Sequence, residues 1–217
     1  MGVIQALNES GVVAIIRGLQ PNYIYSVVEA LKKGGVRAIE VTVDTPNVCE
    51  VVEKLRSLHT NDLSIGAGTV LNSRMAEEVI EAGAQFILSP NVNKKVIETT
   101  KQHDIISIPG AFTPSEIVEA HQYGADVIKL FPAHILGTKF IKSIRDPLPN
   151  IPLLPTGGIN SVNATEFINL GVLGVGVGGS LVFKQRTYGT DDLLRIQENA
   201  SSIVTNIKEA RKEHKNE

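Results

Sequence analysis

Lys129 is the residue of this chain whose surroundings point most directly to covalent chemistry. It lies in the middle of the segment Asp126–Pro132, which is otherwise apolar or β-branched and has the composition of a short buried β-strand. Burial disfavours a charged ammonium group and lowers its pKa, which leaves a neutral, nucleophilic amine. Such an amine can form a Schiff base with a carbonyl compound. The alternative is a structural lysine paired with a carboxylate, and this segment alone is compatible with both.

The composition is that of an ordinary soluble globular protein. The chain has 217 residues, of which 42% are hydrophobic and 20% charged, and a formal net charge of −2. This charge is not typical of proteins that bind nucleic acid or an anionic membrane. The single cysteine, Cys49, excludes an internal disulfide and a cysteine-cluster metal site. Neither a signal peptide nor a run of about 18 apolar residues is present, so we expect a cytoplasmic protein.

Eight strand–helix units follow one another after a short helical lead-in over Val3–Asn8. The expected strands are the apolar runs at 12–16, 36–43, 63–69, 85–89, 104–108, 126–132, 151–155 and 172–177. This alternation implies a parallel sheet with right-handed crossovers. Eight units without a break in composition favour one domain over residues 1–217, a compact (β/α)8 TIM barrel, although such barrels typically have about 250 residues. A doubly wound open sheet is the alternative.

Polar residues gather where the expected strands end, which is where a barrel of this kind carries its active site. Arg17 ends the first strand, Glu40 interrupts the second and Thr69 ends the third. Side chains two positions apart on a strand share a face, so these residues are expected to meet Lys129 in the barrel interior. No grouping of His, Asp and Glu has the spacing of metal ligands.

Glycine-rich turns follow the last two expected strands, at Gly157-Gly158 and at 178–180. Each precedes an expected helix start, where free backbone N–H groups and the helix dipole favour an anion. The loops after strands seven and eight are the usual phosphate site of such barrels. The alternative is two tight turns that need a positive φ. Because both turns fall at these two positions, we expect a phosphate site.

Taken together, the motifs resemble those of the KDPG/KHG aldolases. These class I aldolases act on 2-keto-3-deoxy-6-phosphogluconate (KDPG) and 2-keto-4-hydroxyglutarate (KHG). The resemblance covers nearly the whole chain and is carried, in order, by the segments Glu40–Thr42, Ile65–Leu71, Leu88–Pro90, Ile128–Ala133, Pro155–Gly158 and Val177–Leu181. It implies a compact (β/α)8 barrel, a homotrimer, and a reaction that uses neither a metal nor an organic cofactor.

The resemblance also implies a role for individual residues. Lys129 would be the Schiff-base lysine and Glu40 the acid/base that moves protons. The pyruvate end of the substrate would be lined by Thr69, Pro90 and Phe131. The phosphate-bearing end would be held by Thr156, Gly157, Gly158, Gly179 and Ser180.

The sequence departs from the family pattern at the partner of the substrate carboxylate. Many members have an arginine where Asp44 stands, and Asp44 would repel a carboxylate. Arg17 could replace that arginine, because a guanidinium holds a carboxylate in a bidentate manner. Pro90-Asn91 and His134 also differ from the commonest forms, and the former resembles the galactonate-specific branch.

We therefore expect an aldehyde-lyase that cleaves a phosphorylated keto acid, KDPG, to pyruvate and glyceraldehyde 3-phosphate in the Entner–Doudoroff pathway. KHG, cleaved to pyruvate and glyoxylate, is a possible second substrate. A 2-keto-3-deoxy-6-phosphogalactonate aldolase is the nearest alternative. A phosphosugar isomerase or epimerase on the same barrel, or a non-catalytic phosphometabolite-binding protein, would share the glycine turns but would need no imine.

Overall fold

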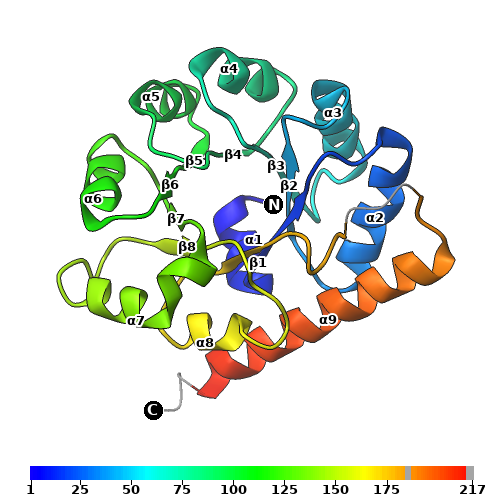
Figure 1. Ribbon diagram of the computed structural model, residues 1–217. Helices are drawn as coiled ribbons and strands as arrows, with labels where there is room; N and C mark the ends of the chain where they lie inside the picture. Colours follow the sequence, from blue (N-terminus) through cyan, green and yellow to red (C-terminus); the bar gives the residue numbers. More distant parts are fainter. Residues whose placement is uncertain (184–186, 214–217) are drawn as a thin grey trace.

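Parallel strands lie around a common centre; the first helix lies over this centre, and the other helices lie on the outside (Figure 1). The structure is a computed structural model, and it describes residues 1–183 and 187–213. The strands are β1 Val12–Ile16, β2 Ala38–Thr42, β3 Ser64–Gly68, β4 Phe86–Leu88, β5 Ile106–Ile108, β6 Gly110–Ala111, β7 Ile128–Leu130, β8 Leu153–Pro155 and β9 Val175–Val177. The helices are α1 Val3–Ser10, α2 Pro21–Lys33, α3 Val48–Leu58, α4 Ser73–Glu81, α5 Lys94–Gln102, α6 Pro114–Gln122, α7 Ala133–Arg145, α8 Ala164–Ile168 and α9 Thr190–Glu213.

The strands form two parallel sheets, and the prediction of a compact (β/α)8 TIM barrel is wrong. Six strands pair in the order β5-β4-β3-β2-β1-β9, and three pair in the order β6-β7-β8. The division falls at Pro109: β5 pairs with β4, whereas β6 pairs with β7. Proline has no N–H with which to continue a ladder. At the other junction β8 ends at Pro155, and the described backbone shows an isolated bridge between Thr156 and Gly176 instead of a ladder.

The order of the larger sheet also differs from that of a doubly wound sheet. Strands β5 to β1 follow one another in chain order, so each α-helical crossover moves to the next position along the sheet. A doubly wound sheet instead reverses its order at a switch point. The larger sheet is therefore a half-barrel, and the three-stranded sheet faces the same interior (Figure 1).

Helix α1 fills one end of this interior. It contributes Val3, Ala6 and Leu7 to a buried cluster that includes side chains from strands of both sheets: Val13, Ala38, Phe86, Leu88, Ile108, Val127 and Leu154. The helix ends at Gly11, whose φ of 71° places it in the left-handed region and whose N–H donates to the carbonyl of Leu7 (2.8 Å). The opposite end of the interior, beyond the carboxyl ends of the strands, remains for the candidate site.

The start of α6 carries the capping box that the sequence indicates. The Thr113 hydroxyl accepts from the Glu116 N–H (3.3 Å), and the Glu116 carboxylate accepts from the Thr113 N–H (2.8 Å). The Phe112 N–H also donates to this carboxylate, and that bond is the main reason why the pKa of Glu116 lies below its ordinary value. These contacts fix the turn between β6 and α6, next to the strand that carries Lys129.

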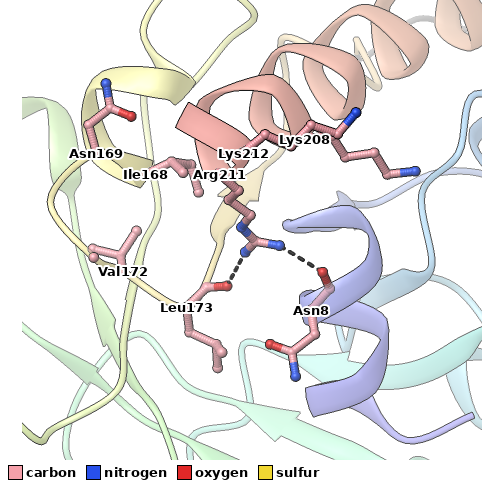
Figure 2. Close-up of a pocket in the computed structure, with 9 residues that line it drawn as sticks. Asn8, Ile168, Asn169, Val172, Leu173, Lys208, Arg211 and Lys212 are labelled. Carbon is pink, nitrogen blue, oxygen red and sulfur yellow. Dashed lines mark hydrogen bonds between the residues drawn. The ribbon is translucent and has the colours of Figure 1, made fainter. Parts of the chain in front are cut away.

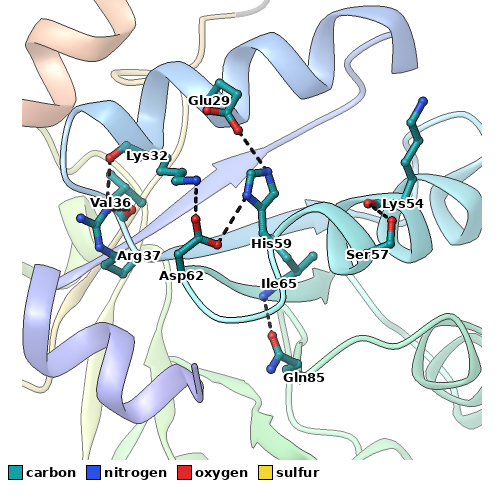
Figure 3. A network of polar contacts seen from close by, with 10 residues as sticks. All are labelled: Glu29, Lys32, Val36, Arg37, Lys54, Ser57, His59, Asp62, Ile65 and Gln85. Atoms are coloured by element: carbon teal, nitrogen blue, oxygen red, sulfur yellow. Dashed lines mark hydrogen bonds and ion pairs between the residues drawn. The ribbon is translucent and has the colours of Figure 1, made fainter.

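A polar network ties α2 to the turn between α3 and β3 (Figure 3). The His59 ring is buried, with Nε2 3.4 Å from Glu29 Oε1 and Nδ1 3.6 Å from Asp62 Oδ1. Lys32 pairs with Asp62, and its hydrogen bond is the largest of the effects that lower the Asp62 pKa. The network lies at the amino ends of the strands, away from the candidate site.

Helix α9 packs along α2 and α8 and closes the molecule on that side (Figure 1). Gly34, at the end of α2, permits the close approach, because a Cβ at this position would lie 2.5 Å from Ala200 Cβ. Of the helices in the described ranges, none combines the length and apolar character needed to cross a membrane.

Candidate active site

Lys129 and Glu40 are buried in the shared interior on strands of different sheets. Lys129 on β7 is 3% exposed, and Glu40 on β2 is fully buried. Burial lowers the pKa of Lys129, and the charge of Arg17 lowers it further against the opposing effect of Glu40. Burial raises the pKa of Glu40, and the positive charges of Lys129 and Arg17 only partly oppose this rise. The two groups act on each other through space, since no Glu40–Lys129 salt bridge occurs among the described ion pairs.

The backbone holds Lys129 firmly in the smaller sheet. Its N–H donates to the carbonyl of Pro109 (2.9 Å), and the residue lies opposite Gly110 on β6 and Leu154 on β8. Its Nζ lies 4.9 Å from the centre of the Phe131 ring, two residues further along the chain. The amine therefore has an apolar wall on one side, which adds to the desolvation that favours its neutral form.

The Glu40 carboxylate has no hydrogen-bond partner for either oxygen within the described part of the chain. It lies on the larger sheet, where Glu40 pairs in register with Ile15 on β1 and Gly66 on β3. Its side chain occupies the space above Gly68, and a Cβ at that glycine would overlap with it. An unsatisfied, fully buried carboxylate is stabilised by taking up a proton, which is the property needed of a proton carrier.

A pocket of about 330 Å³ opens beside Lys129 at the carboxyl ends of the strands. This volume lies within the range of small-molecule sites. The pocket includes eight of the residues singled out from the sequence: Arg17, Lys129, Phe131, Thr156, Gly157, Gly158, Gly179 and Ser180. The other three, Glu40, Thr69 and Pro90, do not line it.

Arg17 and Thr69 meet at the side of the pocket nearest the larger sheet. Arg17 Nη2 donates to Thr69 Oγ1 (3.2 Å). Thr69 has a φ of 62°, which is strained for a β-branched residue and costs on the order of 1–3 kcal/mol. Strain of this kind is found mainly where function requires a particular backbone position. Pro90 lies elsewhere, with its carbonyl against Gly110 of β6.

The two glycine turns form the far end of the pocket. Gly157 and Gly158 have φ values of 97° and 75°. Their carbonyl oxygens accept from the His134 N–H (3.1 Å) and from the Asn163 side chain (2.9 Å), respectively. Within the described residues, the N–H groups of Gly158, Gly179 and Ser180 donate no hydrogen bond. Several free N–H groups at one end of a pocket are the arrangement that binds an anion.

Three further residues line the pocket and were not predicted from the sequence: Ile15, Ile159 and Asn160; Gly178, which also lines it, belongs to the predicted glycine turn. Asn160 carries a signal that could have found it, since its side chain accepts from the N–H groups of Val162 (2.9 Å) and Asn163 (3.2 Å). Asn in such a turn, two residues after a glycine pair, is typical of a loop with fixed geometry. The apolar Ile15 and Ile159 carry no comparable signal.

His134 lies beside the pocket, next to Gly158. A Cβ at Gly158 would come within 2.5 Å of the His134 Cβ, so the glycine allows the helix start to approach the turn. The histidine side chain is exposed and does not line the pocket. In the described ranges, no group of three or more His, Cys, Asp or Glu side chains is placed to hold a metal ion.

A buried amine and a buried carboxylate beside a substrate-sized pocket, on an α/β half-barrel, have the chemistry that an enzyme needs to form an imine with a small carbonyl compound. The model of the family "KDPG and KHG aldolase" matches residues 3–199. The chain belongs to this family.

Individual relatives agree with this assignment. A probable 2-dehydro-3-deoxy-6-phosphogalactonate aldolase of Rhizobium meliloti is 35% identical over 174 residues, which are 80% of this chain and 82% of that protein. The KHG/KDPG aldolase of Escherichia coli is 32% identical over 203 residues, which are 93% of this chain and 94% of that protein. A crystal structure of KDPG aldolase from Legionella pneumophila, with pyruvate captured as a covalent carbinolamine intermediate, superposes with a TM-score of 0.78 at 29% identity and covers 97% of this chain and 98% of that one.

The family assignment confirms the resemblance seen in the sequence and the prediction of an aldolase, which is a carbon–carbon lyase. It favours the aldolase over the isomerase and the binding protein that the sequence left open.

Proposed function

We propose that this chain is a class I aldolase that uses Lys129 to cleave KDPG to pyruvate and glyceraldehyde 3-phosphate. The observation that carries the proposal is the position of Lys129: a buried amine with a lowered pKa in the wall of a pocket whose far end presents free N–H groups. The covalent pyruvate adduct described for the Legionella relative supports the same chemistry.

The reaction begins at the C2 ketone. The neutral Lys129 amine adds to this carbon to form a carbinolamine, which loses water to give a protonated imine. The lost hydroxyl needs a proton to leave as water. Glu40, whose pKa is raised by burial, retains a proton at a pH where an exposed carboxyl has lost it and can supply that proton.

Carbon–carbon cleavage uses the imine as an electron acceptor. Glu40, now a carboxylate, removes the proton of the C4 hydroxyl directly or through a water molecule. The C3–C4 bond breaks, C4 becomes the aldehyde of glyceraldehyde 3-phosphate, and the electron pair moves onto C3 and the imine nitrogen to form an enamine. Protonation at C3 and addition of water then release pyruvate and restore Lys129. One carboxyl group thus alternates between acid and base.

The two ends of the substrate are held by different parts of the pocket. Arg17 lines it beside Lys129, has no carboxylate partner among the described ion pairs, and is available for the substrate carboxylate. The phosphate is proposed to bind the N–H groups of Gly158, Gly179 and Ser180. Thr156 and Phe131 line the stretch between these ends, and Thr69 supports Arg17 through its hydroxyl.

Borohydride reduction in the presence of pyruvate tests the proposal. Reduction converts an imine into a stable secondary amine, so the peptide that contains Lys129 should acquire a pyruvate-derived mass increment. Lys129→Arg should acquire none. Lys101→Arg is the matched control, because Lys101 is a partly buried lysine paired with Asp126 outside the pocket, and this variant should be labelled like the wild type. Absence of the increment in folded wild-type protein would refute the Schiff-base mechanism.

The proposed role of Arg17 has its own test. Arg17→Lys keeps the charge but loses the planar fork that binds a carboxylate in a bidentate manner. We expect the KM for the keto acid to rise about tenfold or more, which corresponds to about 1.4 kcal/mol. An unchanged apparent affinity for pyruvate in the trapping reaction would rule out Arg17 as the carboxylate partner.

The choice between gluconate and galactonate substrates depends on the configuration at C4. The relative from R. meliloti is named for the galactonate form, and Pro90-Asn91 points the same way, so the galactonate aldolase is the second candidate. A lactate dehydrogenase assay of pyruvate release separates them: we expect a higher kcat/KM with KDPG than with its C4 epimer or with KHG. The reverse order would assign the chain to the galactonate branch.

We further propose that the chain is one domain and assembles as a homotrimer in the cytoplasm. Large apolar side chains are exposed on the segments after β3, β6, β7 and β8: Leu71, Phe112, Ile135 and Val162. Exposed apolar side chains grouped on one face are typical of an interaction surface. Sedimentation equilibrium should give three times the chain mass, and a monomer would refute the assembly. A single cooperative unfolding transition is expected of one domain.

A further inference from the structure

A second cavity, of about 840 Å³, lies at the opposite ends of β1 and β9 from the Lys129 pocket. Its lining comes from α1, α8, α9 and the turn before β9: Asn8, Ile168, Asn169, Gly171, Val172, Leu173, Lys208, Arg211 and Lys212. Leu173 is six residues before Gly179, and a strand advances about 3.3 Å per residue, so the two cavities lie on the order of 20 Å apart along β9. The proposed aldolase reaction makes no use of this second cavity.

The Arg211 guanidinium lies at the centre of the cavity wall (Figure 2). Its Nη1 donates to the carbonyls of Leu7 (3.0 Å) and Asn8 (2.9 Å), and its Nη2 donates to the carbonyl of Leu173 (2.6 Å). A guanidinium has five N–H donors, so these three bonds leave two of them unused. The carbonyls are neutral, and Arg211 forms no salt bridge with a carboxylate in the described ranges, so its charge is not compensated there.

Two further cations stand on the same side of α9. Lys208 and Lys212 are four residues apart, which places them one above the other on one helix face. Among the described residues that line the cavity there are three cations, two asparagine amides and no carboxylate. The nearest acidic residues in sequence, Glu9, Glu209 and Glu213, are not part of the lining. Solvated basic residues are common at the end of a helix, but here they stand around a cavity.

The remaining wall is apolar. Ile168 and Val172 are buried, and Leu173 is partly buried beside them (Figure 2). Small-molecule sites typically combine such an apolar wall with a few converging polar groups, and the volume falls within their range. An inorganic ion alone would leave the apolar side unused.

We propose that this cavity is a binding site for a small organic anion, with its carboxylate or phosphate group between Arg211, Lys208 and Lys212 and its carbon skeleton against Ile168 and Val172. Arg211 has two functions in this arrangement: it caps the carbonyls at the end of α1, and it offers its remaining donors to the ligand. β1 and β9 run from this cavity to the Lys129 pocket, so the ligand contacts segments continuous with two strands that end at that pocket.

Isothermal titration calorimetry with citrate and with glycerol 3-phosphate, at constant ionic strength, tests the site and separates the two anionic groups, because citrate carries only carboxylates and glycerol 3-phosphate only a phosphate. The variant Lys208→Gln/Lys212→Gln removes two charges and leaves Arg211 in place. The control Lys139→Gln/Lys142→Gln removes two exposed charges from α7, which does not line the cavity. We expect the wild type and the control to bind alike and the Lys208/Lys212 variant to bind about tenfold or more weakly; the ligand bound more tightly identifies the preferred group.

A second measurement locates the bound anion independently of the proposed aldolase reaction. At saturating ligand, acetylation of Lys208 and Lys212 by acetic anhydride should slow, whereas acetylation of Lys139 and Lys142 should not. Equal affinities in the wild type and the Lys208/Lys212 variant would overturn the proposal, and so would equal losses in both variants. A dissociation constant weaker than about 10 mM for both ligands would also overturn it.

Discussion

The Glu40 carboxylate occupies the space that a side chain at Gly68 would need. Gly68 ends β3 directly beside β2, and a Cβ built on it would overlap with Glu40 Oε1. Glycine is required at this position because the carboxylate lies above it. The pair therefore links the G-A-G sequence at the end of β3 to the position of the proposed proton carrier.

Gly68→Ala should displace the Glu40 side chain. We expect kcat for aldol cleavage to fall about 100-fold or more, the scale of general acid–base catalysis, and the free energy of unfolding to fall by about 1–3 kcal/mol from overpacking. A pyruvate-release assay and urea unfolding measure the two effects. Gly189→Ala is the control, because its Cβ would have ordinary contact with Asp192 and should change neither quantity. An active Gly68→Ala enzyme would show that Glu40 need not hold its observed position.

Gly158→Ala should affect the phosphate end of the substrate and spare the Schiff base. The new Cβ would press on His134, and the φ of 75° is strained for alanine, so the turn should shift. We expect a rise of about tenfold or more in KM for KDPG, with unchanged borohydride trapping of pyruvate, which has no phosphate. Gly83→Ala is a matched control with a φ of 95° outside the pocket. Loss of trapping in Gly158→Ala would contradict a role confined to the phosphate end.

The raised pKa of Glu40 should make the stability of the protein depend on pH in a definite direction. Above the ordinary value of 4.5 the unfolded chain has lost this proton while the folded chain still holds it, so folded wild-type protein loses stability as pH rises through the folded pKa. Glutamine does not titrate. The free energy of unfolding of Glu40→Gln, relative to wild type, should therefore increase from about pH 4 to pH 8. A difference that is flat or decreases over this range would contradict the raised pKa.

Replacing both buried ionisable residues should stabilise the fold and abolish activity. Glu40 and Lys129 are both desolvated without a direct salt bridge between them, so little of the desolvation free energy is recovered. Apolar replacement of such groups is neutral or stabilising by about 1–4 kcal/mol. We expect Glu40→Leu/Lys129→Met to unfold at higher urea concentration than the wild type at neutral pH. A double variant less stable than the wild type would contradict this expectation and indicate that the two side chains stabilise each other.

His59 should matter for stability and not for catalysis. Its ring is 4% exposed and lies between carboxylates of α2 and of the turn before β3 (Figure 3). His59→Ala should lower the free energy of unfolding by about 1–3 kcal/mol and leave kcat/KM unchanged. The exposed His121→Ala on α6 should stay within about 0.5 kcal/mol of the wild type. A loss of activity in folded His59→Ala would indicate that the network reaches the pocket.

The sequence was sufficient to predict the alternation of strands and helices apart from the short strand β6, the burial of Lys129 and the glycine turns at the end of the last strands. These features depend on local patterns: apolar runs, residues such as Gly11 that permit left-handed backbone, and the capping box of α6. The motifs were sufficient to predict the aldolase family, which the comparisons confirm.

How the strands close, and which residues share the pocket, could be seen only once the chain is folded. The periodicity of the sequence predicted strand 104–108 but not that Pro109 divides the backbone between two sheets, because pairing depends on partners distant in the chain. The sequence also did not predict the contact of Glu40 with Gly68, the left-handed backbone of Thr69 or the presence of Ile15 and Asn160 in the pocket. The alternation of residues along a strand predicts on which face of the sheet a side chain lies. The register between strands determines which neighbouring side chains it contacts there.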